Sequence, residues 1–105
     1  MTHILDRLTT TIEARKGADP ETSYTASVLS RGPEGAAAKF KEEATEFIRA
    51  VSDEEPERVT AEAADVIYHM LVAMAARDVP ASALWDELEK REGISGLAEK
   101  SSRKS

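Results

Sequence analysis

The sequence contains no cysteine and few aromatic residues, and these two shortages limit what its interior and its chemistry can be. The absence of thiols excludes disulfides and zinc–thiolate sites and suits a reducing compartment such as the cytoplasm. Only 5% of the residues are aromatic while 41% are hydrophobic. A core must therefore be built mainly from alanine, valine, leucine, isoleucine and methionine, which favours helices over a sheet.

Long apolar runs are missing as well. No stretch approaches the ~20 apolar residues that cross a bilayer, and the N-terminal residues lack the basic and apolar regions of a signal peptide. We therefore expect a cytoplasmic protein without a membrane partner. With 105 residues the chain can form one modest core. We expect one domain over residues 1–94 and a polar, mobile tail over residues 95–105.

Negative charge is concentrated in one stretch of the chain. Residues 42–65 hold nine acids and two bases, whereas the whole sequence has a net charge of −6. A nucleic-acid-binding protein usually shows the opposite, a basic stripe that meets the phosphates, so we expect no nucleic-acid partner. A solvated helix face is the usual meaning of an acidic run, but an internal repetition within this run favours a function.

The periodicity of apolar residues predicts an all-α protein, since no alternating strand pattern is found. Helices are expected over residues 2–16, 34–52, 56–77 and 81–91. Gly17 is a suitable stop for the first, because glycine readily adopts a left-handed conformation. The hydroxyl-rich stretch 22–31 fits either a helix or a loop. Its serines, threonines and tyrosine suit both ligand contacts and ordinary capping.

The two long helices should form an antiparallel hairpin, because only a few residues join them. Their apolar positions, together with Leu84 and Leu88 of the last helix, are expected to face the core. So small a helical bundle leaves apolar surface uncovered, and a homodimer or higher homo-oligomer would bury it. The expected core-facing positions of the hairpin are Ala37, Phe40, Ala44, Phe47, Ile48 and Val51, followed by Val59, Ala63, Val66, Ile67, Met70, Leu71 and Met74.

Two acid pairs repeat across the hairpin: Glu43 with Glu46, and Glu62 with Asp65. Acids three residues apart on a helix are neighbours on one face, and such like charges are unfavourable unless a cation lies between them. At 100° per residue, each pair falls at the same edge of its apolar stripe. If the stripes pack together, the four carboxylates meet at the rim of that interface, which predicts a divalent-cation site.

Oxygen ligands alone favour Mg²⁺, with Mn²⁺ as a substitute. Zinc would require histidine or cysteine, and only His3 and His69 are present. His69 follows Asp65 by four residues, and we expect it to have a structural or substrate-contacting role rather than to bind the metal. A magnesium site of carboxylates suits a polyphosphate substrate, because the cation neutralises phosphate charge and activates water. Candidate phosphate contacts are Lys39, Lys41, Arg31 and Arg91.

These residues resemble a known family. Glu43-x-x-Glu46 and Glu62-x-x-Asp65 resemble the metal motif of the all-α, MazG-like nucleoside-triphosphate pyrophosphohydrolases. Within that group the chain is similar over nearly its whole length to the phosphoribosyl-ATP pyrophosphohydrolases, which act in the second step of histidine biosynthesis. The more specific motifs are Ser23-Tyr24-Thr25, Leu29 with Gly32, Lys39 before Glu42-Glu43-Ala44-Thr45-Glu46, Tyr68-His69, Glu87-Leu88 with Arg91, and Glu99-Lys100.

The resemblance implies Mg²⁺-dependent hydrolysis of 1-(5-phosphoribosyl)-ATP to 1-(5-phosphoribosyl)-AMP and pyrophosphate. It implies that Glu43, Glu46, Glu62 and Asp65 are metal ligands and that the catalytic acids include Glu42, Glu43 and Glu46, with Glu42 as an auxiliary acid or base. The implied substrate contacts are Ser23, Tyr24, Thr25, Lys39, His69 and Arg91. Phe40 and Lys41 depart from the residues that the family often has beside the acid motif.

Two alternatives remain open. The first is a pyrophosphohydrolase that acts on another nucleoside triphosphate, such as a noncanonical one, because the chemistry would be shared and only the base and ribose contacts would differ. The second is a helical dimerisation module without catalytic activity, whose acids only keep the surface solvated.

Overall fold

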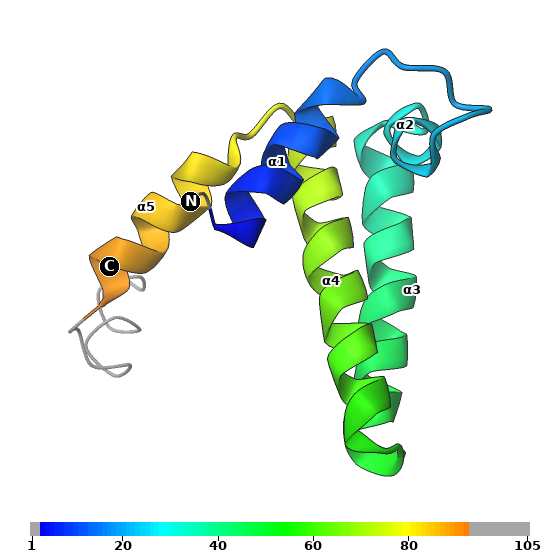
Figure 1. The fold of residues 1–105 in the computed structure, drawn as a ribbon, viewed down its shortest axis with the longest axis vertical. Helices are drawn as coiled ribbons and strands as arrows, with labels where there is room; N and C mark the ends of the chain where they lie inside the picture. Colours follow the sequence, from blue (N-terminus) through cyan, green and yellow to red (C-terminus); the bar gives the residue numbers. More distant parts are fainter. Residues whose placement is uncertain (1–2, 93–105) are drawn as a thin grey trace.

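The computed structural model describes residues 3–92, and within this range it contains helices and no strand, which confirms the all-α prediction. Figure 1 shows the path of the chain through them. The helices are α1 (Ile4–Ala14), α2 (Tyr24–Leu29), α3 (Gly32–Asp53), α4 (Pro56–Ala76) and α5 (Ala81–Arg91).

Helices α3 and α4 form the predicted antiparallel hairpin and make the most extensive contact between elements (Figure 1). The hairpin turns at Glu54 and Glu55, and α4 begins at Pro56. Proline suits the first turn of a helix, where its missing N–H is not needed. The predicted bounds of both long helices are correct to within two residues at each end.

The stretch 22–31, for which the sequence left helix and loop open, contains the short helix α2. Ser23 caps it, since its hydroxyl oxygen accepts a hydrogen bond of 3.1 Å from the amide of Ala26. Gly17 lies in the preceding connection with φ of 78°, which confirms the left-handed conformation predicted for it. Helix α2 packs against both α3 and α4, and α1 packs against α4.

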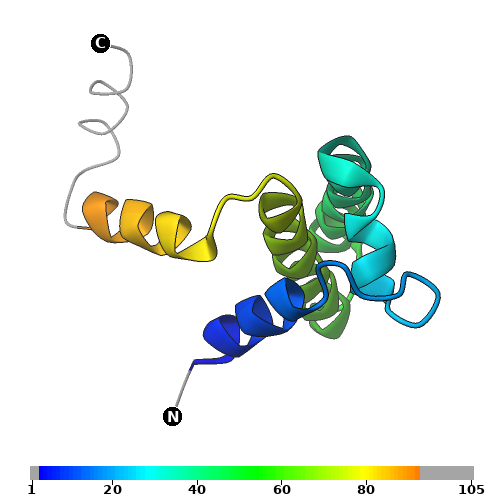
Figure 2. The same ribbon diagram turned by 90° about the horizontal axis from the view of Figure 1, so that it is seen from above.

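The hydrophobic core lies at the end of the hairpin that is remote from its turn. There α1 and α2 cover the end of α4 and the start of α3 (Figure 2). Leu71 was predicted for this core, whereas Val72 and Ala75 were missed because α4 carries a second apolar side, toward α1, next to the side that faces α3. The buried core residues are Ile12, Val28, Ala36, Leu71, Val72, Ala75 and Ala81.

Five residues that were expected to face the core are exposed: Ala37, Ile48 (65%), Val51 (59%), Ile67 (40%) and Leu88 (54%). The prediction is wrong for them within the single chain. Near the hairpin turn, α3 and α4 cover only each other, so their remaining sides face solvent. Helix α5 extends away from the hairpin in both views (Figures 1 and 2), which leaves Leu88 uncovered.

Helix α4 is long and apolar enough, by length and composition, to cross a membrane. The central helix of a packed bundle passes the same test, and α4 contacts α1, α2, α3 and α5. Gly93, which the sequence suggests as the cap of the last helix, and the predicted tail over residues 95–105 lie outside the described residues.

Candidate metal centre and substrate site

Three of the four predicted metal ligands converge between the two arms of the hairpin. One carboxylate oxygen from each of Glu43, Glu62 and Asp65 lies within 4.8 Å of the other two. Glu43 comes from α3, and the other two come from α4, one turn apart. Such a set of oxygen donors suits a hard divalent cation, which would also relieve the repulsion among the carboxylates. Glu46 is not part of this three-carboxylate cluster.

The two acid pairs are not equivalent in burial. Glu62 is only 7% exposed and Glu43 is half-buried, whereas Asp65 and Glu46 are exposed. The sequence predicted that both pairs lie half shielded at the rim of the helix interface. The first acid of each pair is sheltered in this way, while the second acid of each is open to solvent. A ligand would therefore approach from the side of Asp65 and Glu46.

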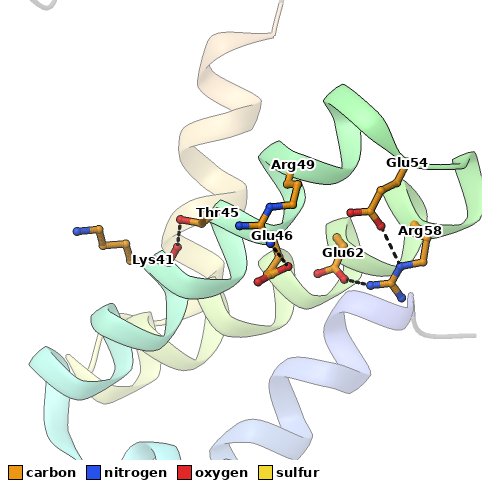
Figure 3. A network of polar contacts seen from close by, with 7 residues as sticks. All are labelled: Lys41, Thr45, Glu46, Arg49, Glu54, Arg58 and Glu62. Carbon is orange, nitrogen blue, oxygen red and sulfur yellow. Dashed lines mark hydrogen bonds and ion pairs between the residues drawn. The ribbon is translucent and has the colours of Figure 1, made fainter.

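Two arginines that were not predicted as site residues lie beside Glu46 and Glu62 (Figure 3). The guanidinium of Arg58 pairs with the buried carboxylate of Glu62 and lies 3.4 Å from Glu54. Arg49 lies 3.5 Å from Glu46. The spacing of four residues from Arg58 to Glu62 is a signal that could have found the first pair, because such residues are neighbours on a helix.

Lys39 supplies positive charge from α3. Its ammonium lies 3.5 Å from Glu43 and 3.6 Å from the exposed carboxylate of Glu42. The pKa of Lys39 is raised above its usual value, first by its electrostatic interaction with Tyr24; desolvation opposes this increase, and the carboxylates of Glu42 and Glu43 add to it. A tyrosine hydroxyl carries charge only at alkaline pH. At neutral pH the carboxylates of Glu42 and Glu43 therefore contribute more to the charged state of Lys39. Lys39 therefore stays charged beside the acid cluster.

Helix α2 meets α4 beside the acid cluster through paired polar side chains. The hydroxyl of Tyr24 lies 2.9 Å from Nε2 of His69, and Nδ1 of His69 lies 2.8 Å from the backbone oxygen of Asp65. The hydroxyls of Thr25 and Tyr68 share a second hydrogen bond. Four residues that the family resemblance singled out thus form one polar contact between α2 and α4.

Other predicted contacts lie farther from this arrangement. Arg91 is the last residue of α5, where it pairs with Glu87 at 3.1 Å, and α5 runs away from the hairpin (Figure 1). Figure 3 shows the side chain of Lys41 directed away from the carboxylates of Glu46 and Glu62. Arg31 precedes α3 as its N-cap residue and is exposed. Within this single chain, Lys39 lies at the acid cluster, whereas Arg31, Lys41 and Arg91 do not.

The fold is an all-α helix hairpin that gathers carboxylates from both arms, with lysine and arginine at their edge, and this oxygen-donor cluster fits a cation. The chain belongs to the phosphoribosyl-ATP pyrophosphohydrolase family, whose model matches residues 5–92. That range includes every acid of the candidate site and all five helices except the first residue of α1.

Curated relatives cover nearly the whole chain. A phosphoribosyl-ATP pyrophosphatase of Cereibacter sphaeroides (strain ATCC 17025) is 55% identical over 100 residues, which span 95% of this chain and 97% of the relative. Proteins of the same name from Dinoroseobacter shibae and Paracoccus denitrificans are also 55% identical and share 95% of this chain, over 98% and 93% of their own lengths.

Proposed function

We propose that the protein hydrolyses 1-(5-phosphoribosyl)-ATP to 1-(5-phosphoribosyl)-AMP and pyrophosphate, the second step of L-histidine biosynthesis. The observation that carries the proposal is the convergence of Glu43, Glu62 and Asp65 within 4.8 Å, with Lys39 beside Glu43. Membership of the phosphoribosyl-ATP pyrophosphohydrolase family, and the names of relatives that are 55% identical, support this choice of substrate.

The cluster fits a magnesium ion, with manganese as a substitute. Glu43, Glu62 and Asp65 would hold it, and Glu46 is exposed on the side from which a ligand would approach. When bound, Mg²⁺ neutralises phosphate charge and lowers the pKa of a bound water. The donor chemistry supports this choice, because the clustered groups are all carboxylates and no histidine or cysteine nitrogen or sulfur belongs to the three-carboxylate cluster.

The reaction needs a base and cations from the chain itself. Water adds to the phosphorus, the bond to the pyrophosphate oxygen breaks, and a carboxylate takes the proton from water. We assign this role to Glu42, which is exposed next to the cluster and is held by Lys39 at 3.6 Å. Lys39 would also bind the phosphate chain. Ser23, Tyr24, Thr25 and Arg91 remain proposed substrate-binding residues, and Glu43 and Glu46 remain proposed catalytic acids. His69, for which the sequence left a structural or a substrate-contacting role, is proposed to belong to the substrate site through its bond to Tyr24.

We also propose that two copies form a homodimer through an open apolar face of the hairpin. We define this face by Phe40, Ile48 and Val51 of α3 and by Ile67, Met70 and Met74 of α4. It includes a shallow hollow of about 310 Å³ lined almost wholly by apolar side chains. Helical spacing places the acid pairs at the edge of the same face, so a second copy would lie beside the candidate site.

Cytoplasmic localisation and a catalytic domain over residues 1–94 complete the proposal. The family match over residues 5–92 supports the domain, and the names of the relatives, which are those of a biosynthetic pyrophosphatase, support the location.

Product analysis with purified protein, Mg²⁺ and phosphoribosyl-ATP tests the function. We expect stoichiometric pyrophosphate and phosphoribosyl-AMP, and a loss of more than about a hundredfold in kcat for Glu43→Gln and Asp65→Asn, since removing one preorganised charged group commonly costs that much. Both variants should remain helical by circular dichroism. Full turnover in the presence of a chelator would contradict the proposal.

The two alternatives give different results. A panel of noncanonical triphosphates would reveal an enzyme of another nucleotide if one of them were the better substrate. A non-catalytic module would show no rise in thermal midpoint with millimolar Mg²⁺, whereas a cation that binds only the native state must raise it by mass action. Glu62→Gln should abolish that rise.

A further inference from the structure

His69 is a buried histidine whose two ring nitrogens are both engaged inside the protein. It lies on α4, one turn beyond Asp65, and only 5% of its surface is exposed. Its Nδ1 lies 2.8 Å from the backbone oxygen of Asp65. A carbonyl oxygen can only accept a hydrogen bond, so Nδ1 must carry the proton and donate it.

The tautomer at Nδ1 determines what happens at Nε2. In the neutral ring Nε2 is the acceptor, and the hydroxyl of Tyr24 at 2.9 Å therefore donates its proton to His69. His69 would have to give up one of these bonds to contact a substrate itself. The hydroxyl oxygen of Tyr24 is left with lone pairs only. It can accept a hydrogen bond from a hydroxyl, amino or ammonium group but has no proton to offer a phosphate oxygen.

The Tyr24–His69 hydrogen bond helps to hold α2 against α4, because α2 is short. A helix of six residues is far below the roughly 12–15 residues needed for stability on its own. Its polar ties to α4 are the Tyr24–His69 bond and the Thr25–Tyr68 bond. The rings reinforce them: Tyr24 stacks on Tyr68 at 6.3 Å and meets the edge of His69 at 5.8 Å.

Tyr24 itself is open to solvent, with 51% of its surface exposed. It interacts electrostatically with Lys39, which lies 3.5 Å from Glu43 of the acid cluster. The half-exposed side chain of Tyr24 is thus held beside Lys39, the proposed phosphate contact, by the buried side chain of His69. His69 also contacts the backbone of Asp65, so a single imidazole links α2 to the part of α4 that supplies two of the clustered carboxylates.

We propose that His69 is a positioning residue that fixes Tyr24 as a hydrogen-bond acceptor for a donor group of the nucleotide substrate, such as a sugar hydroxyl. The role rests on the proposed function only for the identity of that nucleotide. His69 acts through Tyr24 and through the placement of α2, while Tyr24 is the residue that touches the substrate.

Conservative substitutions at His69 separate the two ring nitrogens. His69→Asn retains a donor in the place of Nδ1 and loses the acceptor for Tyr24, whereas His69→Gln can place an amide oxygen near the position of Nε2. We expect His69→Asn to raise the KM for phosphoribosyl-ATP by roughly three- to tenfold with little change in kcat, the range for loss of one hydrogen bond. His69→Gln should restore KM to within about twofold of the wild-type value.

A double-mutant cycle with Tyr24→Phe tests the coupling. Because Phe also lacks the hydroxyl, we expect Tyr24→Phe alone and Tyr24→Phe/His69→Asn to show the same increase in KM, not the product of two increases. Inhibition by inorganic pyrophosphate, which offers no sugar hydroxyl, should be unchanged in all variants. The positioning role would be overturned if the two increases in KM multiplied in the double variant. Weaker inhibition by pyrophosphate in parallel with the increase in KM would also overturn it.

Thermal unfolding provides a readout that does not depend on the substrate. Tyr68→Phe removes the other hydrogen bond between α2 and α4. It serves as the control for a weaker contact between the two helices with the Tyr24–His69 bond intact. If KM simply followed the thermal midpoint across Tyr68→Phe, His69→Asn and His69→Gln, His69 would be a structural residue only and the inference would fail. Failure of the wild-type protein to hydrolyse phosphoribosyl-ATP would instead contradict the proposed function, while the Tyr24–His69 cycle in thermal unfolding would still show whether the bond exists.

Discussion

At the scale of single residues, the site depends on the partner of a buried carboxylate. Glu62 is 7% exposed and lies close to two other acids. Its neutralising partner in the chain is Arg58, whose own side chain is 56% exposed. An ion pair that is half open to water is weaker than a fully buried one, but its loss leaves a buried charge without a partner. Arg58 therefore occupies the electrostatic role that a metal ion would also fill.

This overlap gives a prediction for Arg58→Met. The metal-free protein should lose about 1–3 kcal/mol of stability, below the cost of breaking a fully buried pair because Arg58 is half-exposed. Mg²⁺ should bind several-fold more tightly, because a positive neighbour of Glu62 has been removed. Calorimetric titration of Mg²⁺ and urea unfolding with and without the ion measure both effects.

Arg49→Met is the matched control for Arg58→Met. Its partner Glu46 is 49% exposed, so we expect a stability change below about 1 kcal/mol, as for ordinary surface ion pairs. Weaker Mg²⁺ binding in Arg58→Met would contradict the competition between arginine and metal, and would mean that Arg58 holds Glu62 in the binding orientation.

Much of the residue-level site could be predicted from the sequence because it depends on helical periodicity. The spacing of Glu43, Glu62 and Asp65 relative to the apolar stripes was enough to predict that they meet. The unequal burial within each pair could not be predicted, since it depends on how far α3 and α4 shelter each position. The tie between Tyr24 and His69 could not be predicted either, because it joins residues 45 positions apart through the placement of α2.

At the scale of elements, the start of α3 contains an unusual glycine. Gly35 lies inside the helix, where glycine is normally less stable than alanine by up to about 1 kcal/mol. A Cβ at this position, however, would lie 2.3 Å from Cβ of Arg31, one turn earlier. That atom is attached to the backbone and cannot swing away as the end of a side chain can. The close approach of residues 31 and 35 thus requires glycine.

We therefore expect Gly35→Ala to destabilise the protein by roughly 1–3 kcal/mol, the usual range for overpacking, although helix propensity alone predicts stabilisation. Urea unfolding monitored by circular dichroism measures the change. In an Arg31→Gly background the obstructing Cβ is gone, and the same substitution should become neutral or stabilising. A stabilising Gly35→Ala in the otherwise unchanged protein would show that the chain relaxes without cost.

Proline, glycine and apolar spacing were sufficient to predict four helices of the bundle. Pro56 and the acids before it marked the turn of the hairpin, and α5 has the predicted range. Helix α2 remained undecided because its intrinsic preference is weak and its stability comes from contacts with α3 and α4. Tertiary contacts of this kind leave little periodic signal in six residues.

At the scale of the whole molecule, the chain exposes more apolar surface on one side of the hairpin than solubility favours. The open apolar face was expected to be core, and its exposure in the single chain is the reason for the proposed dimer. Apolar side chains at Ile48 and Val51 are 65% and 59% exposed. Sequence patterns identify such residues as buried but do not tell whether their partner is the same chain or another copy.

The wild-type protein should sediment as a dimer at micromolar concentration. A glutamate at position 48 would place a charge in the apolar contact, so Ile48→Glu should weaken association by roughly a hundredfold or more. Ile4→Glu, at a position of similar exposure (58%) on α1, is the control and should remain dimeric. A monomeric wild-type protein at all concentrations would contradict the dimer without affecting the acid cluster.

Helix α4 has a different task on each of its sides. One side carries Leu71 and Val72 into the core, another carries Glu62 and Asp65 to the candidate metal centre, and a third carries Met70 and Met74 to the open apolar face. Few positions of this helix are therefore free to vary during evolution without affecting folding, ion binding or assembly. Neutral drift should be concentrated instead on the exposed positions of α1, which contribute to neither the candidate metal centre nor the open apolar face.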